Sequence, residues 1–255
     1  MPRFSINASM MLNEHAFLDR FQAAADLGFK GVDIQFPYDH PADTVAARAA
    51  AAGVEIVLIN VPAGDLSQGG DGLACVPGRE DKFASALEMA RTYVDALGCR
   101  RVNVLAGRLP AGVDPAKARS TLAGNLRRAA DLFAPMGVTV MLEPCNTQDV
   151  PRYLVSRMAD AIALLDECER PSLALQFDFY HRQVMEGELL EGFRAALPRI
   201  AHLQFADAPG RHEPGTGGID FPALFAAIDA SGYDGWVGAE YTPSTTTAAS
   251  LGWFR

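Results

Sequence analysis

The sequence predicts an α/β fold, a single (β/α)8 TIM barrel over residues 1–255. The first reason is that 255 residues, 49% of them hydrophobic, can bury one large core. The second is that short β-rich runs alternate with amphipathic stretches along the chain, a pattern typical of a parallel sheet. The third is that several predicted helices end in a glycine just before the next strand. Eight right-handed crossovers of this kind close a sheet into a barrel.

Eight segments rich in β-branched and apolar residues are predicted to form the strands. They cover residues 4–7, 32–34, 54–60, 102–105, 138–142, 172–178, 200–205 and 236–240. Glycine precedes five of them, at Gly28, Gly53, Gly98, Gly137 and Gly232. Glycine accepts the left-handed conformation that closes a last helical turn, so each of these positions is expected to mark a helix end.

Helices are predicted where apolar residues recur at helical spacing between the strands. The first is expected to begin at an N-cap, Asn13, and to reach residue 25. The others cover residues 44–53, 79–97, 116–133, 158–165 and 222–228. Two irregular stretches, 62–77 and 206–218, follow strands, and we therefore expect them at the catalytic face of the barrel.

The rival fold is an open, doubly wound sheet. That fold usually carries a glycine-rich phosphate turn after its first strand. Here the first predicted strand leads into residues 8–11, Ala-Ser-Met-Met, which form no such turn. The barrel is therefore the preferred prediction.

Charge and composition restrict the classes of function. A net charge of −9 without a basic tract is unfavourable for binding nucleic acid or an anionic membrane. No apolar run approaches the length of a membrane span, and the first residues lack the apolar stretch of a signal peptide. The four cysteines, at 75, 99, 145 and 168, form no Cys-x-x-Cys pair. We expect free thiols in a reducing cytoplasm.

Four of the later strands end in, or lead to, a polar residue where an apolar run stops. These residues are Glu143, Asp178, Gln204 and Glu240, about one strand–helix unit apart. Strand ends at the same edge of a barrel face one another, so the four side chains are expected to converge on the barrel axis.

Three converging carboxylates need compensation, because like charges within a few ångströms raise the pKa of at least one of them. A divalent cation removes this conflict. Three carboxylates and an amide oxygen form a hard, oxygen-only set, which favours Mg²⁺ or Mn²⁺, with Co²⁺ and Zn²⁺ as alternatives. A structural zinc site would be expected to use cysteine or histidine.

The chain resembles the hydroxypyruvate isomerase family, within the xylose-isomerase-like barrel superfamily, nearly from end to end. The segments that carry the resemblance include Phe36-Pro37-Tyr38, Pro62-Ala63-Gly64-Asp65, Leu142-Glu143-Pro144-Cys145-Asn146-Thr147, Gln176-Phe177-Asp178-Phe179-Tyr180-His181, His202-Leu203-Gln204, Pro209-Gly210-Arg211-His212-Glu213-Pro214 and Glu240-Tyr241.

The resemblance implies a metal-dependent isomerase. Positions matching Glu143, Asp178, Gln204 and Glu240 bind the metal in such proteins, and the two glutamates form the acid/base pair. The implied reaction interconverts an aldehyde and a ketone through an enediol, for example hydroxypyruvate and tartronate semialdehyde, or a related 2-oxo acid. The implied partner is a small hydroxy-carbonyl substrate. Barrels of this type often form homo-oligomers, although the sequence contains no recognisable interface.

Further polar residues near strand ends are predicted to contact substrate: His181, Arg211, Asn7, Asn146 and His212. For His181 the alternatives are a hydrogen bond to a substrate oxygen and orientation of Glu143. His202 lies two positions before Gln204, so it shares that face of the strand one layer deeper. We expect His202 to be a buried supporting residue.

The sequence departs from the family pattern at three loop positions where related isomerases commonly carry arginine. These positions are Asp71, Gln148 and Thr242. Arginine is the natural bidentate partner of a substrate carboxylate, so its absence predicts a weaker grip on an anion. The alternative function is therefore an isomerase or epimerase of a neutral keto-sugar. Arg108, Arg211 or His212 remains available as an anion contact.

Two other classes of function fit less well. A phosphodiester hydrolase of the same superfamily would be expected to need a histidine-rich, multi-metal cluster and a basic groove, whereas this chain has five histidines and a charge of −9. A non-catalytic sugar-binding barrel would not need to keep both glutamates together with the other two ligands.

Overall fold

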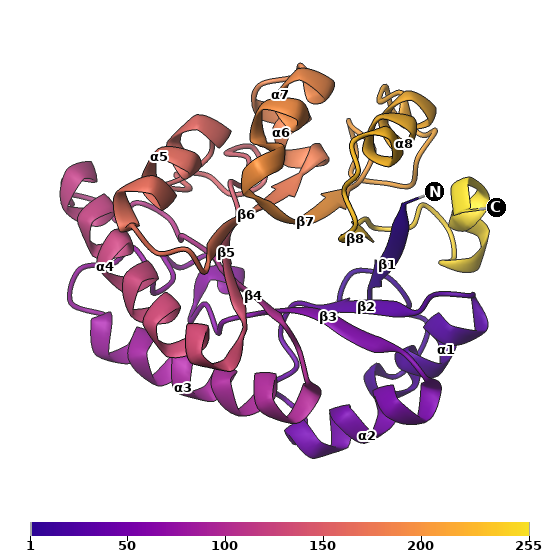
Figure 1. The fold of residues 1–255 in the computed structure, drawn as a ribbon, viewed down its shortest axis with the longest axis horizontal. Helices are drawn as coiled ribbons and strands as arrows, with labels where there is room; N and C mark the ends of the chain where they lie inside the picture. Colours follow the sequence, from indigo (N-terminus) through magenta and orange to yellow (C-terminus); the bar gives the residue numbers. More distant parts are fainter. Residues whose placement is uncertain (1, 255) are drawn as a thin grey trace.

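Eight parallel strands pair in chain order, and β1 pairs with both β2 and β8, so the sheet closes on itself (Figure 1). The computed structural model describes residues 2–254. The strands are β1 (Arg3–Asn7), β2 (Gly31–Ile34), β3 (Glu55–Asn60), β4 (Arg101–Val104), β5 (Thr139–Leu142), β6 (Leu173–Asp178), β7 (Ile200–Phe205) and β8 (Trp236–Ala239). The predicted (β/α)8 barrel is confirmed.

Helices surround the barrel on its outside (Figure 1). They are α1 (Arg20–Asp26), α2 (Ala42–Ala52), α3 (Glu80–Leu97), α4 (Pro115–Phe133), α5 (Met158–Cys168), α6 (Phe179–Met185), α7 (Leu189–Ala196) and α8 (Phe221–Ala230). Short 3-10 segments are η1 (Phe17–Asp19), η2 (Leu66–Gln68), η3 (Ala134–Met136), η4 (Leu197–Arg199) and η5 (Ala248–Phe254). None of the helices within residues 2–254 combines the length and apolar character that crossing a membrane requires.

Glycines end α2 and α3 as predicted. Gly53 and Gly98 have φ angles of 69° and 61°, which is the left-handed conformation that residues with a Cβ rarely adopt. The amide of Gly53 donates to the carbonyl of Ala50, and a strand follows directly. The glycine–strand pattern therefore reports helix ends correctly at these positions.

One helix start was predicted incorrectly, and two helices were missed. Asn13 does not cap a helix, because its Nδ2 donates to the carbonyl of Met10 and helical structure begins only at η1. Helices α6 and α7 were not predicted. Helix α6 begins at Phe179, directly after β6, with Asp178 as N-cap accepting from the amide of Tyr180 at 2.7 Å. No turn residues separate β6 from α6, so the sequence pattern does not indicate where the strand ends and the helix begins.

The segment η5 follows β8 and packs between α8 and α1 (Figure 1). The ring of Phe254 stacks on Phe29 with centroids 4.3 Å apart. Trp253 contacts Phe4 and Phe205 edge-on, at 5.1 and 5.0 Å. Aromatic pairs of this geometry add to the stabilisation that apolar burial provides. Segment η5 therefore packs against aromatic residues of β1, β7 and the segment before β2.

The barrel interior contains a layer of buried polar side chains beneath the catalytic face. His202, expected to be buried below Gln204, is wholly buried, and its Nε2 lies 2.9 Å from Oδ2 of Asp33. Gln176 donates from Nε2 to Oε1 of Gln204 at 2.6 Å. Gly238 makes room for this layer, because a Cβ there would lie 2.3 Å from Oδ2 of Asp33. The strands thus carry a layer of hydrogen-bonded polar side chains inside the barrel, directly below the catalytic face.

Candidate active site

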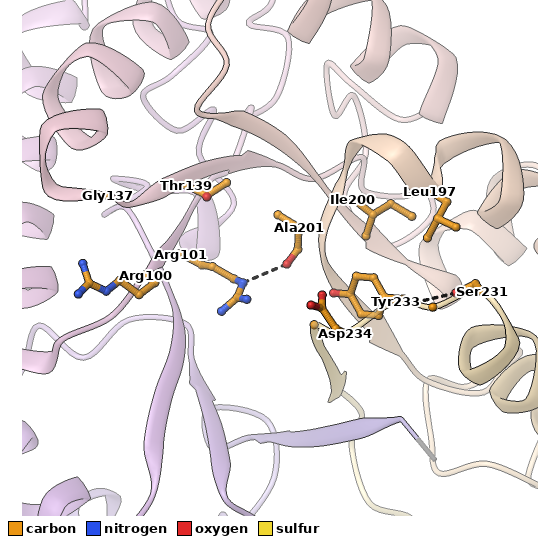
Figure 2. A pocket seen from close by; sticks show the side chains of 12 residues that line it. Arg100, Arg101, Gly137, Thr139, Leu197, Ile200, Ala201, Ser231, Tyr233 and Asp234 are labelled. Atoms are coloured by element: carbon orange, nitrogen blue, oxygen red, sulfur yellow. Dashed lines mark hydrogen bonds between the residues drawn. The ribbon is translucent and has the colours of Figure 1, made fainter.

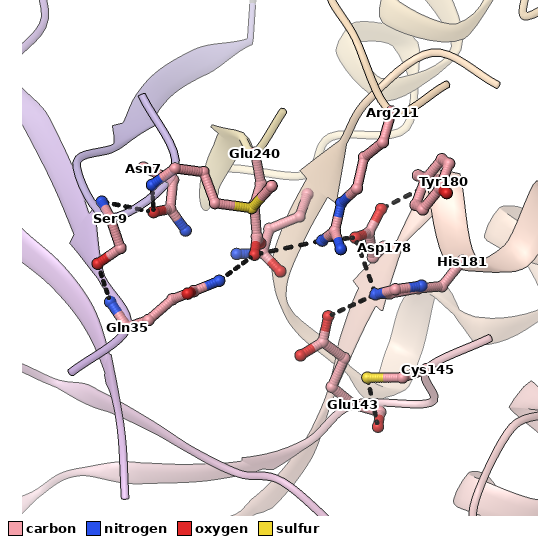
Figure 3. A network of polar contacts seen from close by, with 12 residues as sticks. Asn7, Ser9, Gln35, Glu143, Cys145, Asp178, Tyr180, His181, Arg211 and Glu240 are labelled. Atoms are coloured by element: carbon pink, nitrogen blue, oxygen red, sulfur yellow. Dashed lines mark hydrogen bonds and ion pairs between the residues drawn. The ribbon is translucent and has the colours of Figure 1, made fainter. Parts of the chain in front are cut away.

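Three carboxylates meet at the carboxyl ends of the strands, as the four polar strand ends predicted. Glu143 follows β5, Asp178 ends β6 and Glu240 follows β8. One carboxylate oxygen from each lies within 4.8 Å of the others, and all three side chains are buried. Figure 3 shows them turned toward one another, with Arg211 and His181 beside them. The structure therefore brings the predicted acids together.

A cavity of about 140 Å³ opens over Glu143 and Glu240, two of these acids. Its wall includes Asn7, Gln35, Asn60, Glu143, Cys145, Gln176, His181, Gln204, Arg211 and Glu240, together with apolar residues from β2, β3 and the loops after β2, β4 and β5. Asn7, Glu143, His181, Gln204, Arg211 and Glu240 are predicted site residues that line it. The amide oxygen of Asn7 already accepts from the backbone amides of Ser9 and Met10.

A wider cavity of about 450 Å³ lies at the opposite end of the barrel, among the starts of β4, β5 and β7 (Figure 2). Arg101 lines it and donates from Nε to the carbonyl of Ala201 at 3.0 Å. The acid cluster is far from this cavity in the fold. Barrel enzymes carry their chemistry at the carboxyl ends of the strands, so the smaller cavity is the candidate active site.

Burial and mutual repulsion control the charges of the acids. Burial, followed by the charges of Glu240 and Asp178, raises the pKa of Glu143 well above its ordinary range. Burial raises the pKa of Glu240 to about 7, although Arg211 and a hydrogen bond from Gln35 act in the opposite direction. Burial also raises the pKa of Asp178. Without a cation, the cluster therefore holds extra protons at neutral pH.

Arg211 is the positive charge within the cluster. Its NH2 lies 3.4 Å from Oε1 of Glu240 and 3.7 Å from Oδ2 of Asp178. Its guanidinium stands 5.0 Å from the centre of the Tyr180 ring. Burial opposes the charge, but the neighbouring carboxylates raise the pKa of Arg211 overall. The side chain is 21% exposed, and its Nε is buried without a hydrogen-bond partner.

The loop that carries Arg211 is organised by Asp207. The buried Asp207 carboxylate accepts from four backbone amides of the loop, those of Ala208, Gly215, Gly217 and Ile219, at 2.8–3.1 Å. Such a buried anion needs several donors, and the loop folds around it to supply them. The irregular stretch 206–218 is therefore a fixed structure that holds Arg211 over the acids.

The cluster fits a divalent cation. Oδ2 of Asp178 and Oε2 of Glu240 are buried and have no hydrogen-bond partner. Oε2 of Glu143 accepts from Nδ2 of Asn103 at 2.9 Å. Gln204 accepts one hydrogen bond at its amide oxygen, which leaves that oxygen a second lone pair. Buried carboxylate oxygens without donors are costly unless a cation compensates them, so this oxygen-rich set is consistent with a metal site.

His181 faces the acids through one ring nitrogen. Its Nε2 lies 3.8 Å from Oε1 of Glu143 and 3.7 Å from Oδ2 of Asp178 (Figure 3). Burial, with a smaller effect of Arg211, lowers the pKa of His181 well below its ordinary value. The ring is therefore neutral at physiological pH, and it lies next to both acids rather than forming a charged pair with them.

Two predicted substrate contacts lie outside the cavity wall. Asn146 is wholly buried behind His181, and its side chain is used in hydrogen bonds within the loop after β5. His212 points away, with Nδ1 2.7 Å from the carbonyl oxygen of Thr242. Both residues follow a site residue closely in sequence, but the loop turns their side chains away from the cavity.

The sequence prediction missed two polar residues at the cluster. Gln35, the residue after β2, donates from Nε2 to Oε1 of Glu240 at 2.7 Å. Asn103 on β4 donates to Glu143. Gln35 carries the same signal as the predicted acids, a polar residue where an apolar strand stops. Asn103 lies inside a strand, and no sequence pattern indicates its partner.

The three loop positions without arginine do not line this cavity. Asp71 pairs with Arg152 at 3.0 Å, and Gln148 and Thr242 are exposed. Arg108 is likewise held elsewhere, donating to the carbonyls of Leu66 and Gly70. Within the described residues 2–254, the arginine that reaches the cavity wall is Arg211.

A closed (β/α)8 barrel with a buried acid cluster at the carboxyl ends of its strands defines a class of small-molecule enzymes suited to a divalent cation. The chain belongs to the xylose isomerase-like TIM barrel family, whose model matches residues 21–255. It is 45% identical over its whole length to a 2-oxo-tetronate isomerase of Cupriavidus necator and covers 98% of that protein. It is 43% identical, over 99% of the chain and 98% of the relative, to a hydroxypyruvate isomerase of Escherichia coli.

A solved structure agrees with this assignment at the level of the fold. A Brucella melitensis protein described as AP endonuclease, family 2, superposes with a TM-score of 0.96 at 40% identity, over 100% of this chain and 98% of its own. With the two sequence relatives, the comparison places the chain among the isomerases of the xylose isomerase-like barrels.

Proposed function

We propose that this chain interconverts a small hydroxylated 2-oxo acid, of the hydroxypyruvate or 2-oxo-tetronate type, with its aldehyde or ketone isomer. The observation that carries the proposal is the position of Arg211, which reaches the cavity between Asp178 and Glu240. A guanidinium recognises a carboxylate in a bidentate manner. One cavity thus offers the Arg211 guanidinium for the acid group of the substrate and two glutamates for the transfer of its protons.

The size of the cavity supports a compound of three or four carbons. Its volume of about 140 Å³ is below the range of about 300–1,000 Å³ that is typical of pockets for larger ligands. Part of that space would be taken by a cation. A hexose would require the loops to move apart, whereas a small 2-oxo acid would not.

Glu143 and Glu240 are proposed to move the proton. One carboxylate removes the proton from the hydroxyl-bearing carbon next to the carbonyl, and a proton returns to the former carbonyl carbon. The proton of that hydroxyl moves to the former carbonyl oxygen, so that the carbonyl shifts by one position. A glutamate with a raised pKa can accept and release a proton near neutral pH. His181 and Arg211 are proposed to donate hydrogen bonds to substrate oxygens, where negative charge develops as the proton leaves.

Glu143, Asp178, Gln204 and Glu240 are proposed to hold a divalent cation, with Mg²⁺ or Mn²⁺ preferred and Co²⁺ or Zn²⁺ as alternatives. A bound cation would supply Lewis-acid stabilisation of that developing charge. The donor set supports this, since two of its buried oxygens accept no hydrogen bond.

A second candidate is an isomerase or epimerase of a neutral keto-sugar. It is favoured by one observation, the absence of arginine at Asp71, Gln148 and Thr242. The small cavity and Arg211 favour the acid. A nuclease is a weaker candidate despite the description of the Brucella relative, because the net charge is −9 and the possible metal-holding groups in residues 2–254 contain one histidine.

The proposal is tested by isotope exchange. The protein with Mg²⁺ or Mn²⁺ is incubated in D2O with hydroxypyruvate, 2-oxo-tetronate, or neutral tetruloses and ketopentoses, and NMR follows deuterium at the carbon next to the carbonyl. We expect the highest kcat/KM on one of the 2-oxo acids, with the carbonyl shifted in the product. A higher kcat/KM on a neutral ketose would replace the proposal by the second candidate. Retention of the carbonyl position with inversion of one carbon would indicate an epimerase.

A further inference from the structure

Asn146 contacts His181 with two donors. The backbone amide of Asn146 lies 3.3 Å from Nδ1 of His181, and its side-chain Nδ2 lies 2.7 Å from the same nitrogen. The orientation of the Asn146 amide is fixed, because its Oδ1 accepts from the backbone amides of Gln148 and Asp149 at 3.0 and 2.8 Å. Because Oδ1 faces these two N–H groups, the NH2 group of Asn146 must lie on the side of His181.

This arrangement determines which ring nitrogen of His181 carries the proton. The side-chain NH2 of Asn146 donates to Nδ1 over the shorter contact and the backbone N–H over the longer one, so Nδ1 is an acceptor and carries no hydrogen. The single proton of the neutral imidazole is then on Nε2, which faces Glu143 and Asp178 in the cavity (Figure 3). The same donors oppose a second proton on Nδ1 and thereby oppose the doubly protonated, charged ring.

The loop that carries Asn146 is also bonded to Tyr180, the neighbour of His181 on helix α6. Nδ2 of Asn146 donates to Oδ2 of Asp149 at 2.9 Å, and the hydroxyl of Tyr180 donates to the same oxygen at 2.9 Å. The Tyr180 ring in turn lies under the guanidinium of Arg211. Loop and helix α6 therefore hold His181 and Arg211 in one connected arrangement, in which Asn146 contacts no cavity surface itself.

We propose that Asn146 is a positioning residue that fixes His181 as the Nε2–H tautomer, so that the ring donates a hydrogen bond into the cavity and does not act there as a base or a metal ligand. The identity of the bond partner as a substrate oxygen rests on the proposed function. The tautomer itself rests only on the contacts of Asn146.

The tautomer is measurable by ¹⁵N NMR of the Mg²⁺-loaded protein labelled at histidine nitrogens. Two-bond ¹H–¹⁵N correlations separate a protonated ring nitrogen from an unprotonated one, and His181→Gln assigns the signals among five histidines. We expect Nε2 of His181 protonated and Nδ1 unprotonated across neutral pH. A protonated Nδ1 with an unprotonated Nε2 in the unaltered protein would overturn the inference.

Asn146→Asp reverses the pattern with almost no change of shape. The new carboxylate retains an oxygen for the amides of Gln148 and Asp149 but replaces the shorter of the two donors toward Nδ1 by a charged acceptor. The backbone amide of residue 146 remains, at the longer distance of 3.3 Å. We expect the proton pattern of His181 to change, either to Nδ1–H alone or to both nitrogens protonated. The signals of His202, which pairs with Asp33 elsewhere in the barrel, are expected to stay unchanged.

A double variant separates this effect from damage to the loop. Asn146→Asp places two carboxylates side by side, and adding Asp149→Asn restores one donor and one acceptor between the two positions. The double variant should keep the loop while His181 still has the altered proton pattern. Asp149→Asn alone should keep the Nε2–H tautomer. If the double variant regains the wild-type tautomer, Asn146 does not determine it.

Kinetics give the second readout. Loss of one donor to a developing negative charge typically costs about 10²–10³-fold in kcat. We expect kcat of the double variant to fall by about 10²-fold with a smaller rise in KM, since the donor acts mainly in the transition state. If the double variant has the same His181 tautomer as the unaltered protein but a reduced kcat, the loss of activity comes from altered structure and not from the tautomer. Absence of turnover in the unaltered protein on every 2-oxo acid would refute the proposed function and leave the NMR test of the tautomer intact.

Discussion

Nε2 of Gln35 donates a 2.7 Å hydrogen bond to Oε1 of Glu240, which joins the loop after β2 to the residue that follows β8. Arg211 reaches the same oxygen, at 3.4 Å. The other carboxylate oxygen, Oε2, is buried without a partner. Glu240 thus has one oxygen engaged by donors and one left for a cation or a proton.

The first prediction concerns this bond. Gln35→Leu removes the donor and frees the carboxylate to rotate, so affinity for Mn²⁺ should fall about 10–100-fold, as it does when supporting partners of metal ligands are lost. Titration calorimetry on the metal-free protein measures it. Gln22→Leu, which alters an exposed glutamine bonded to Asp26 on α1, is the matched control. Equal Mn²⁺ affinity in Gln35→Leu and the wild type would show that Glu240 needs no such support.

The second prediction concerns the glutamates as proton carriers. Glu143→Gln and Glu240→Gln keep the shape of the side chain and remove its ability to take a proton. Each should lower kcat by about 10²–10⁴-fold, the typical contribution of a positioned acid or base. Glu55→Gln, exposed at the start of β3 and at the other end of the barrel, should leave kcat unchanged. Deuterium exchange into substrate gives the rate, and circular dichroism checks the fold. Full activity of Glu240→Gln would remove this residue from the mechanism.

The third prediction concerns pH. Burial raises the pKa of Glu143 and Glu240 in the folded, metal-free protein, to about 7 for Glu240, whereas unfolded glutamates have ordinary values. The folded state therefore binds more protons between these values, and its stability falls as pH rises through them. Urea unfolding with a chelator should show a lower free energy of unfolding at about pH 8 than at about pH 5.5.

Two controls test the origin of that pH dependence. Saturating Mn²⁺ should restore stability at the higher pH, because the cation stabilises the charged carboxylates and binds only the folded state. Glu240→Gln should reduce the dependence, since it removes one titrating group. A metal-free protein that gains stability over the same rise in pH would contradict the prediction.

The fourth prediction concerns substrate charge. Arg211→Lys keeps a positive charge but loses the planar fork that binds a carboxylate through two donors. We expect KM for a 2-oxo acid to rise by about tenfold or more, corresponding to about 1.4 kcal/mol, while weak activity on a neutral ketose changes little. Arg48→Lys, on the exposed face of α2, is the control. An equal loss on both kinds of substrate would assign Arg211 to the general structure of the site.

The barrel and its acid cluster could be predicted from the sequence because each depends on local pattern. A parallel strand that ends in Glu143 or Asp178 places that side chain at a known edge of the sheet. The tautomer of His181 could not be predicted, because it depends on contacts that Asn146 makes from the loop after β5. Asn146 was predicted to contact substrate, but it does not line the cavity. Its motif lies next to Glu143, but the turn after Cys145 directs its side chain behind the cavity.

The fifth prediction concerns the polar layer below the site. Gly238→Ala would place a methyl group 2.3 Å from Oδ2 of Asp33 and 3.1 Å from Nε2 of His202. Overpacking of this kind typically costs about 1–3 kcal/mol, which chemical denaturation would measure. Gly124→Ala, in the middle of α4 with open space around the new methyl group, should instead stabilise by about 0.5–1 kcal/mol. Equal stabilities of the two variants would mean that the barrel interior adjusts freely.

The same crowding restricts how this barrel can diverge. Asp33 on β2, His202 on β7 and Gly238 on β8 share one small volume, so a substitution at any of them changes which side chains the other two tolerate. A larger residue at position 238 becomes acceptable only after smaller side chains have replaced Asp33 or His202. We therefore expect these three positions to change together among homologues, as an epistatic unit, and substitutions transferred singly between relatives to be harmful even where each parent carries them without cost.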